Sequence, residues 1–169
     1  MWYNLLPVDY NGNGDFIHSC YCVAVSSSPM GPFETIMTNL TGIGYHALPD
    51  APALFVDDDG SAYIAFTDES NHINHVQKLR SDLLGPSSPM EISPQIGPAN
   101  NEGIFMFKRN GLYYVGFGAC CCFCAEGSNV DLYFSKNPLG PYAFAGRVET
   151  AESWRAQTLT GGEQMVFWR

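Results

Sequence analysis

The feature that most restricts the fold of this 169-residue sequence is a repeat of about 50 residues. Each copy begins with a single carboxylate, Asp50 or Glu102, followed by a short apolar segment, a polar turn with glycine, and an aromatic-rich segment. The two carboxylates are 52 residues apart, and the turn glycines, Gly60 and Gly111, are 51 residues apart. This spacing indicates a structural unit that the chain builds more than once.

Three Gly-Pro pairs follow the same period. They begin at Gly31, Gly85 and Gly140, at separations of 54 and 55 residues. Between them, apolar and polar residues alternate over short segments as they do in strands, and no segment has helical periodicity. Repeats of this length made of short antiparallel strands are typical of β-propeller blades, whereas the alternative, a β-sandwich, has no fixed repeat. The sequence therefore predicts an all-β fold and favours a propeller.

The repeat divides the chain into blades of one domain that spans residues 1–169. We expect blades at approximately 1–48, 49–100 and 101–150, and the start of a fourth at 151–169. Because propellers close with about 4–8 blades, a chain of about three blades is expected to be a fragment that is inactive alone. Open sheet edges and apolar blade faces would be exposed, so we also expect poor solubility or self-association.

The charge of the chain bears on its partners. Eight Lys and Arg against 17 Asp and Glu give a net charge of −9, which repels nucleic-acid phosphates and anionic lipids. No run approaches the ~20 apolar residues that cross a bilayer, and the first residues lack the charged and apolar regions of a secretory signal. We therefore expect neither nucleic acid nor membrane as a partner, and the missing signal says little about the compartment.

Six cysteines leave three interpretations open. Four of them crowd into residues 120–124, and Cys20 and Cys22 lie far upstream. The first interpretation is a disulfide-pinned loop in an exported protein. The second is a zinc site that uses the CxxC of the cluster with His72 and His75, and the third is a reactive thiol. Three consecutive cysteines cannot all face one tetrahedral ion, so we expect no metal.

The repeated carboxylates are the candidates for chemistry. In a propeller the first strand of each blade lines the central axis, so equivalent residues of successive blades converge at one end, and Asp50 and Glu102 should be neighbours. Two adjacent carboxylates repel, and the less solvated one keeps its proton to higher pH, which makes it a general acid. Such a pair suits cleavage of a glycosidic bond. A single carboxylate before a strand is usually only a solvated turn residue, so the argument depends on the repeat.

Four segments give the sequence a resemblance to glycoside hydrolase family 43. Residues 49–63 (PDAPALFVDDDGSAY) resemble the second-blade motif of that family, and residues 102–114 (EGIFMFKRNGLYY) resemble its third-blade motif. Residues 135–142 (SKNPLGPY) and 27–33 (SSPMGPF) are also typical of the family. The resemblance implies a five-bladed β-propeller and a secreted, inverting hydrolase that acts on plant-type polysaccharide without a cofactor.

The resemblance also implies roles for individual residues. Glu102 is the general acid, and Asp50 modulates its pKa and orients it. The usual base of the family, an Asp in the first blade, is expected upstream of this chain. A branch similar to the exo-β-1,3-galactanases relies instead on a Gln in the fourth blade, for which Gln164 is the candidate and Gln157 the other possibility. Gly103 departs from the family, in which Ala-Pro commonly follows the acid, and this leaves the substrate preference open.

Four further residues are candidates for substrate binding. Asn71 follows the second strand of the second blade, where relatives place contacts with sugar hydroxyls. Phe123 is suited to stack on a pyranose face, and Tyr45 and His46 precede Asp50 and would flank the same pocket. Each also has an ordinary interpretation as a turn or core residue.

The sequence thus predicts a glycosidase that hydrolyses O-glycosidic bonds in galactan, arabinan or xylan side chains. The rival interpretation is a sugar-binding propeller without catalysis, which would need no base. A third is an interaction scaffold that uses an outer blade face, which would leave the paired carboxylates without a role.

Overall fold

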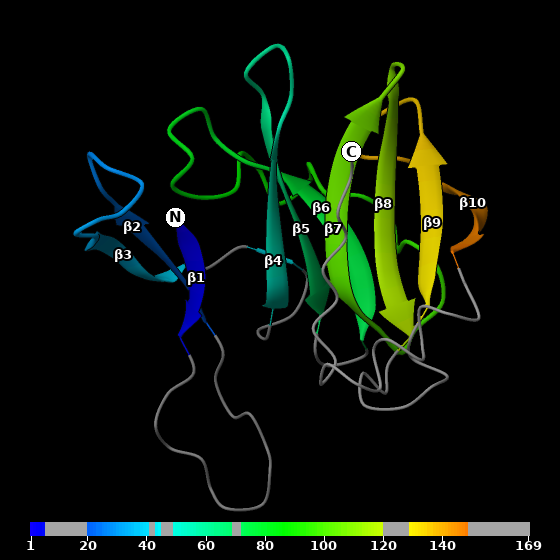
Figure 1. The fold of residues 1–169 in the computed structure, drawn as a ribbon, viewed down its shortest axis with the longest axis horizontal. Coiled ribbons are helices and arrows are strands. Elements are labelled where there is room, and N and C mark those ends of the chain that lie inside the picture. Colours follow the sequence, from blue (N-terminus) through cyan, green and yellow to red (C-terminus); the bar gives the residue numbers. More distant parts are fainter. Residues whose placement is uncertain (6–19, 41–42, 45–48, 69–71, 120–128, 149–169) are drawn as a thin grey trace, which may run out of the picture.

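The computed structural model describes residues 1–5, 20–40, 43–44, 49–68, 72–119 and 129–148. In this part of the chain ten strands form three antiparallel sheets (Figure 1). The same residues contain no helix, and so none long and apolar enough to span a membrane. The first sheet has the order β1-β2-β3, the second β4-β5-β6, and the third β10-β9-β8-β7. The expected all-β fold is confirmed.

The strands follow the alternating segments of the sequence. The first sheet contains β1 (Trp2–Leu5), β2 (Cys20–Val25) and β3 (Glu34–Leu40). The second contains β4 (Pro49–Val56), β5 (Ala62–Asp68) and β6 (Ile73–Lys78). The third contains β7 (Asn101–Arg109), β8 (Leu112–Ala119), β9 (Val130–Ser135) and β10 (Ala143–Val148).

Turns show which strands correspond between the sheets. Gly60 and Gly111, at φ of 83° and 74°, lie in the turns that join β4 to β5 and β7 to β8. The Gly-Pro pairs at Gly31 and Gly140 lie between β2 and β3 and between β9 and β10. Strands β4 and β7 are therefore equivalent, and we call them the inner strands. Strand β1 corresponds to β5 and β8, and the described residues hold no counterpart of the inner strands in the first sheet.

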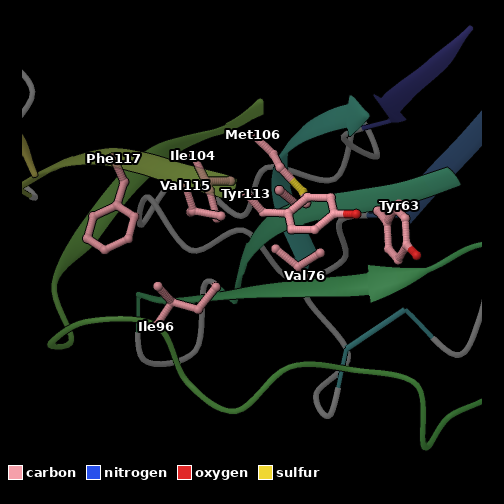
Figure 2. Packing of buried hydrophobic residues seen from close by; sticks show 9 residues of the cluster. Tyr63, Val76, Ile96, Ile104, Met106, Tyr113, Val115 and Phe117 are labelled. Atoms are coloured by element: carbon pink, nitrogen blue, oxygen red, sulfur yellow. The ribbon is translucent and has the colours of Figure 1, made fainter. Parts of the chain in front are cut away.

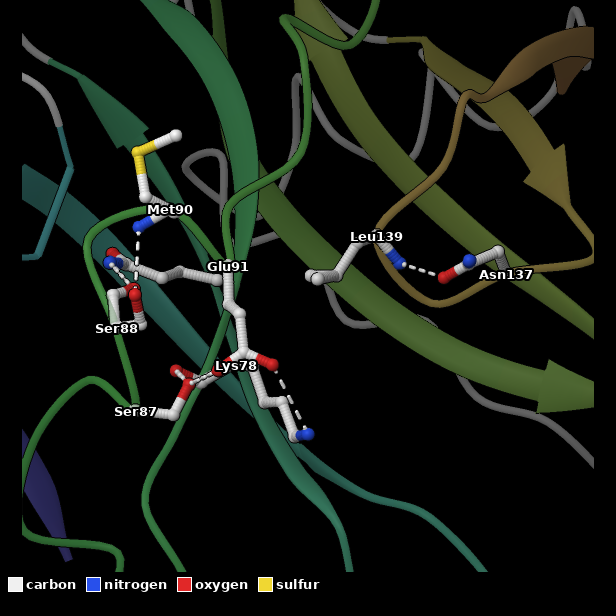
Figure 3. A network of polar contacts seen from close by, with 8 residues as sticks. Lys78, Ser87, Ser88, Met90, Glu91, Asn137 and Leu139 are labelled. Atoms are coloured by element: carbon white, nitrogen blue, oxygen red, sulfur yellow. Dashed lines mark hydrogen bonds and ion pairs between the residues drawn. The ribbon is translucent and has the colours of Figure 1, made fainter.

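Segment 86–96 takes the place of a fourth strand in the second sheet. Ser93 N donates a hydrogen bond to Val76 O at 2.7 Å, and Lys78 N donates to Glu91 O at 2.9 Å. The side chains of Lys78 and Glu91 also form an ion pair at 3.3 Å, beside the turn drawn in Figure 3. Prolines and serines interrupt the alternation here, so this segment was not predicted as a strand. With it, the second sheet has the four-stranded outline of the third.

The main hydrophobic core lies between the second and third sheets (Figure 2). Fully burying one large apolar side chain contributes about 1.5–3 kcal/mol, so this layer is the main force that holds the two sheets together. Its buried members are Tyr63, Ala65, Val76, Ile96, Ile104, Met106, Tyr113, Val115 and Phe117.

Strand β5 is buried on both faces. Tyr63 and Ala65 face the main core, whereas Ile64 and Phe66 belong to a second core that contains residues of the first sheet. Successive side chains of a strand point to opposite faces, so the second sheet lies between the first and the third. The inner strands β4 and β7 are also in contact. Three stacked sheets with one repeat unit each are the arrangement of a propeller and exclude a two-sheet sandwich.

The face of the third sheet that points away from the second carries aromatic rings. Phe107 stacks on Tyr114 with ring centroids 5.0 Å apart, and Phe105 and Phe134 extend the row at 6.2 and 6.5 Å. The described residues place no further sheet against this face. It is the kind of apolar blade face that the sequence predicted, and self-association stays a prediction.

Cys22 is the upstream cysteine whose side chain the structure describes. It is a free thiol, fully buried in β2, so it does not take part in a disulfide. The side chain of Cys20 and the whole cluster at residues 120–124 lie outside the described part of the chain.

Candidate functional site

The two repeated carboxylates occupy equivalent backbone positions. Asp50 is the second residue of β4 and pairs with Thr67 of β5, whereas Glu102 is the second residue of β7 and pairs with Gly118 of β8. Both inner strands begin at the lower edge of the sheets in Figure 1, where β5 and β8 end. The starts of two contacting strands, each with an acidic residue, therefore lie at one edge of the sheets.

A one-residue bulge follows the carboxylate in both strands. From Asp50 to Ala53, β4 advances by three residues while its partner β5 advances by two, from Thr67 to Ala65. From Glu102 to Phe105, β7 likewise advances by three residues while β8 advances by two, from Gly118 to Gly116. A bulge bends its strand and re-aims the neighbouring side chains, so the same device orients both residues. The sequence repeat is thus also a repeat of backbone geometry.

Gly103 owes its identity to this bulge. It follows Glu102 with a φ of 67°, a region that residues with a Cβ rarely adopt. In β4 the equivalent place is taken by Ala51 and Pro52, and proline is also found at bulges because it lacks a backbone donor. Glycine thus suits the conformation of the bulge in β7, whereas the bulge in β4 accommodates Ala-Pro.

Glu102 is partly buried and is contacted by His72. Its side chain is 33% exposed, and its Oε1 atom lies 3.0 Å from Nδ1 of His72. The Nδ1 atom is buried and makes no hydrogen bond within the described residues. The two atoms therefore lie at the distance of an ion pair.

Asn101 fixes the backbone immediately before Glu102. Its N–H donates to His72 O at 3.1 Å. Its buried side-chain amide donates to Pro98 O at 2.6 Å and to Ala99 O at 3.1 Å. The turn that leads into β7 is thus stabilised by hydrogen bonds within the turn and by one to His72, the residue that contacts Glu102.

Sequence reasoning missed the role of His72. It was considered only with His75 as a zinc partner, but the two rings lie in different surroundings. His75 is 3% exposed, its Nδ1 lies 3.1 Å from Ser93 O, and its ring stacks on Phe66 at 5.8 Å. Within the described residues no group of three potential metal ligands exists. No local pattern marks the contact of His72, because 30 residues separate it from Glu102.

Buried polar residues gather at the edge where the inner strands begin. Thr67 and Asp68 end β5 and Asn74 lies near the start of β6, with exposures of 1%, 2% and 0%. Thr67 Oγ1 donates to Asn74 Oδ1 at 2.8 Å. Residues 62–66 of β5, further from this edge, are all apolar. Buried polar groups are costly unless they are bonded, so the polar character of this edge depends on contacts such as that between Thr67 and Asn74.

The remaining candidates cannot be placed relative to this edge. The side chain of Asp50 and all of Asn71, Phe123, Tyr45, His46, Gln164 and Gln157 lie outside the described residues. Their roles stay predictions.

The opposite edge of the second and third sheets carries a charged network. Lys108 Nζ lies 2.5 Å from Asp57 Oδ1 and 3.1 Å from Asp58 Oδ2, and Tyr113 OH donates to Asp57 Oδ2 at 2.5 Å. Burial pushes the pKa of Asp57 up, but hydrogen bonds from Lys108 and Tyr113 outweigh it and hold that pKa below its ordinary value. The same carboxylate raises the pKa of Lys108 and of Tyr113. All three groups keep their usual charge at neutral pH, so the network is a structural link.

Comparison with known proteins decides the family. The model of glycosyl hydrolases family 43 matches residues 1–166. The chain belongs to family 43. A β-D-galactofuranosidase, xynD of Aspergillus niger, is 29% identical over 126 residues, which are 71% of this chain and 34% of that protein.

Solved structures of family 43 enzymes share the fold. A GH43 β-1,3-galactosidase matches with a TM-score of 0.59 and 26% identity, and the match covers 74% of this chain and 25% of that one. An α-L-arabinofuranosidase from Clostridium thermocellum matches with a TM-score of 0.52 and 27% identity, over 75% of this chain and 43% of that one. The fold is therefore that of part of a five-bladed β-propeller. The chain spans less than half the length of each of these relatives.

Proposed function

We propose that this chain supplies the general acid of an inverting glycosidase, together with the residue that orients this acid. The proposed substrates are the galactan, arabinan or xylan side chains of plant-type polysaccharide. Glu102 is the general acid and Asp50 orients it. The observation that carries the proposal is that both residues occupy the same bulged position at the start of contacting inner strands. Relatives named for galactofuranosidase, galactosidase and arabinofuranosidase activities support this substrate class.

The proposed reaction is a single displacement. Glu102 gives its proton to the leaving glycosidic oxygen as the bond to the anomeric carbon breaks. Water attacks that carbon from the opposite face and loses its proton to a base about 6.5–9.5 Å from the acid. The proposed base is an Asp upstream of this chain, with Gln164 as the alternative.

Replacement of Glu102 by Gln tests the acid. The variant is made in the longest polypeptide that the gene encodes, and hydrolysis of galactan, arabinan and xylan oligosaccharides is measured. General acid catalysis contributes about 10²–10⁴-fold, so turnover is expected to fall at least about a hundredfold with unchanged circular dichroism. Glu91→Gln, in the exposed pair with Lys78, is the matched control and should keep full activity. Retained turnover in Glu102→Gln rejects the assignment.

The stereochemistry of the product tests the inverting step separately. Proton NMR of the first sugar released should show the anomeric configuration opposite to that of the substrate. A product with the configuration of the substrate would contradict inversion.

A sugar-binding propeller without catalysis is the rival function. Calorimetry with the same oligosaccharides distinguishes the two, because Glu102→Gln should still bind them after turnover is lost. Binding by the unaltered protein without any turnover would favour the rival.

We also propose that the protein acts outside the cell. Polymeric substrates are met there, and a cysteine cluster such as that at residues 120–124 suits an oxidising compartment. Detection of the protein in the culture medium supports export, and its confinement to the cytosol contradicts it.

A further inference from the structure

His72 lies at the boundary between the second and third sheets, directly before β6, and reaches across to β7. Its Nδ1 atom is 3.0 Å from Oε1 of Glu102, and this nitrogen is inaccessible to solvent although the side chain as a whole is 36% exposed. The contact between this imidazole nitrogen and the carboxylate oxygen therefore joins the two sheets through side chains at this edge.

The backbone of His72 takes part in the same connection. Its carbonyl oxygen accepts the hydrogen bond from Asn101 N at 3.1 Å, and Asn101 directly precedes Glu102. On the other side of Glu102 the chain turns through the bulge at Gly103, with a φ of 67°. His72 therefore holds both the main chain that carries Glu102 and one oxygen of its side chain.

The conformation of His72 adds a second, independent argument. Its φ is 48°, in the left-handed region that residues with a Cβ adopt at a cost. Glycine or asparagine would fit this backbone with less strain. Unfavourable backbone conformations persist where the surrounding structure requires the residue, and they concentrate at functional sites. The backbone strain at His72 thus coincides with its contact to Glu102.

We propose that His72 is a positioning residue for Glu102. Its Nδ1 atom lies against Oε1, which leaves Oε2 as the oxygen open to the leaving group, and the contact limits the rotation of the carboxyl group while the leaving oxygen is protonated. The inference rests on the proposed role of Glu102 as general acid. His72 itself exchanges no proton with the substrate, and its effect appears only in steps that need the acid.

Leaving groups of different acidity test this role. Departure of an alkyl alcohol or a sugar needs a proton from the acid, whereas 2,4-dinitrophenolate leaves without one. His72→Asn keeps a residue that tolerates positive φ. In the longest polypeptide that the gene encodes, it is expected to lower kcat for an alkyl glycoside by about tenfold or more, a part of the 10²–10⁴-fold that a general acid supplies. The kcat for the 2,4-dinitrophenyl glycoside of the same sugar should change less than about threefold, with KM unaltered for both.

The outcomes separate the two proposals. Equal losses on both substrates, or no loss on either, overturn the positioning role, since a merely structural residue would not select by leaving group. Glu102→Gln should show the same selectivity more strongly. If it keeps activity on the alkyl glycoside, the proposed acid fails whatever His72 does. Glu91→Gln is the matched control for removal of a carboxylate that pairs with a cation elsewhere in these sheets.

A spectroscopic measurement tests the contact without turnover. The ring nitrogens of His72 are observed by ¹⁵N NMR in the unaltered protein, in Glu102→Gln and in Glu91→Gln. The Nδ1 resonance should move in Glu102→Gln and stay in place in Glu91→Gln. An Nδ1 resonance that does not respond to Glu102→Gln overturns the proposal even in a preparation that has no activity.

Discussion

The link between the turn of the second sheet and the third sheet allows a quantitative prediction. Asp57 follows β4, its side chain is 6% exposed, and it accepts hydrogen bonds from Lys108 Nζ and Tyr113 OH, both at 2.5 Å. Asp57→Asn keeps the size of the side chain and removes the charge, so the Lys108 ammonium is left beside a neutral amide.

The magnitude follows from the two bonds. A hydrogen bond to a charged group contributes about 1.5–3 kcal/mol when one partner is removed. Lys108 is 25% exposed and regains water, and the amide oxygen can still accept from Tyr113, so both losses are partial. We therefore expect Asp57→Asn to lower the free energy of unfolding by about 2–3 kcal/mol, which for a chain of this size lowers the Tm by roughly 5–10 °C.

Urea unfolding at pH 7, followed by tryptophan fluorescence, measures this loss. Asp59→Asn is the matched control, because Asp59 lies in the same turn, is exposed, and within the described residues accepts a hydrogen bond from Ser61 N at 2.8 Å. It should change the free energy of unfolding by less than about 0.5 kcal/mol. Equal effects of the two substitutions would refute the view that Asp57 links the sheets.

Two further predictions concern pH and close packing. Hydrogen bonds hold the pKa of Asp57 below the ordinary 3.8, so the unaltered protein should have its full excess in free energy of unfolding over Asp57→Asn above about pH 4.5 and lose it as pH falls through the folded-state pKa. Urea unfolding from pH 7 to pH 2.5 measures this difference, and a difference that vanishes by pH 5 contradicts the prediction. In the same assay, Gly97→Ala should destabilise the protein by at least about 1 kcal/mol more than Gly60→Ala. Both glycines have positive φ, but a Cβ at Gly97 would lie 2.7 Å from the Phe117 ring, whereas a Cβ at Gly60 would meet open space. Equal losses of stability would show that the core rearranges to accept the added methyl group.

Local patterns predicted most of the strands. The alternation in residues 20–26 and 73–79 and the glycines of the turns, such as Gly60 and Gly111, act through the backbone of their own segments, so no partner needs to be known. The sequence does not predict segment 86–96 as a strand, because its prolines and serines are typical of a loop although the segment forms hydrogen bonds with β6.

The candidate site likewise contains features that the sequence predicts and contacts that it does not. The repeat alone predicts that Asp50 and Glu102 stand at the start of equivalent strands, and the pairing of β4 and β7 confirms it. The contact of His72 with Glu102 and the link from Asp57 to Lys108 join residues 30 and 51 positions apart, and no spacing rule connects them.

By itself, the sequence determined the strands, the turns and the period of the blades, because hydrophobic alternation and the conformational freedom of glycine act over a few neighbouring residues. Only the tertiary structure decided which face of each blade is covered and which histidine touches Glu102. Those contacts depend on how separate sheets stack, and stacking is settled by the packing of whole surfaces that no single segment specifies.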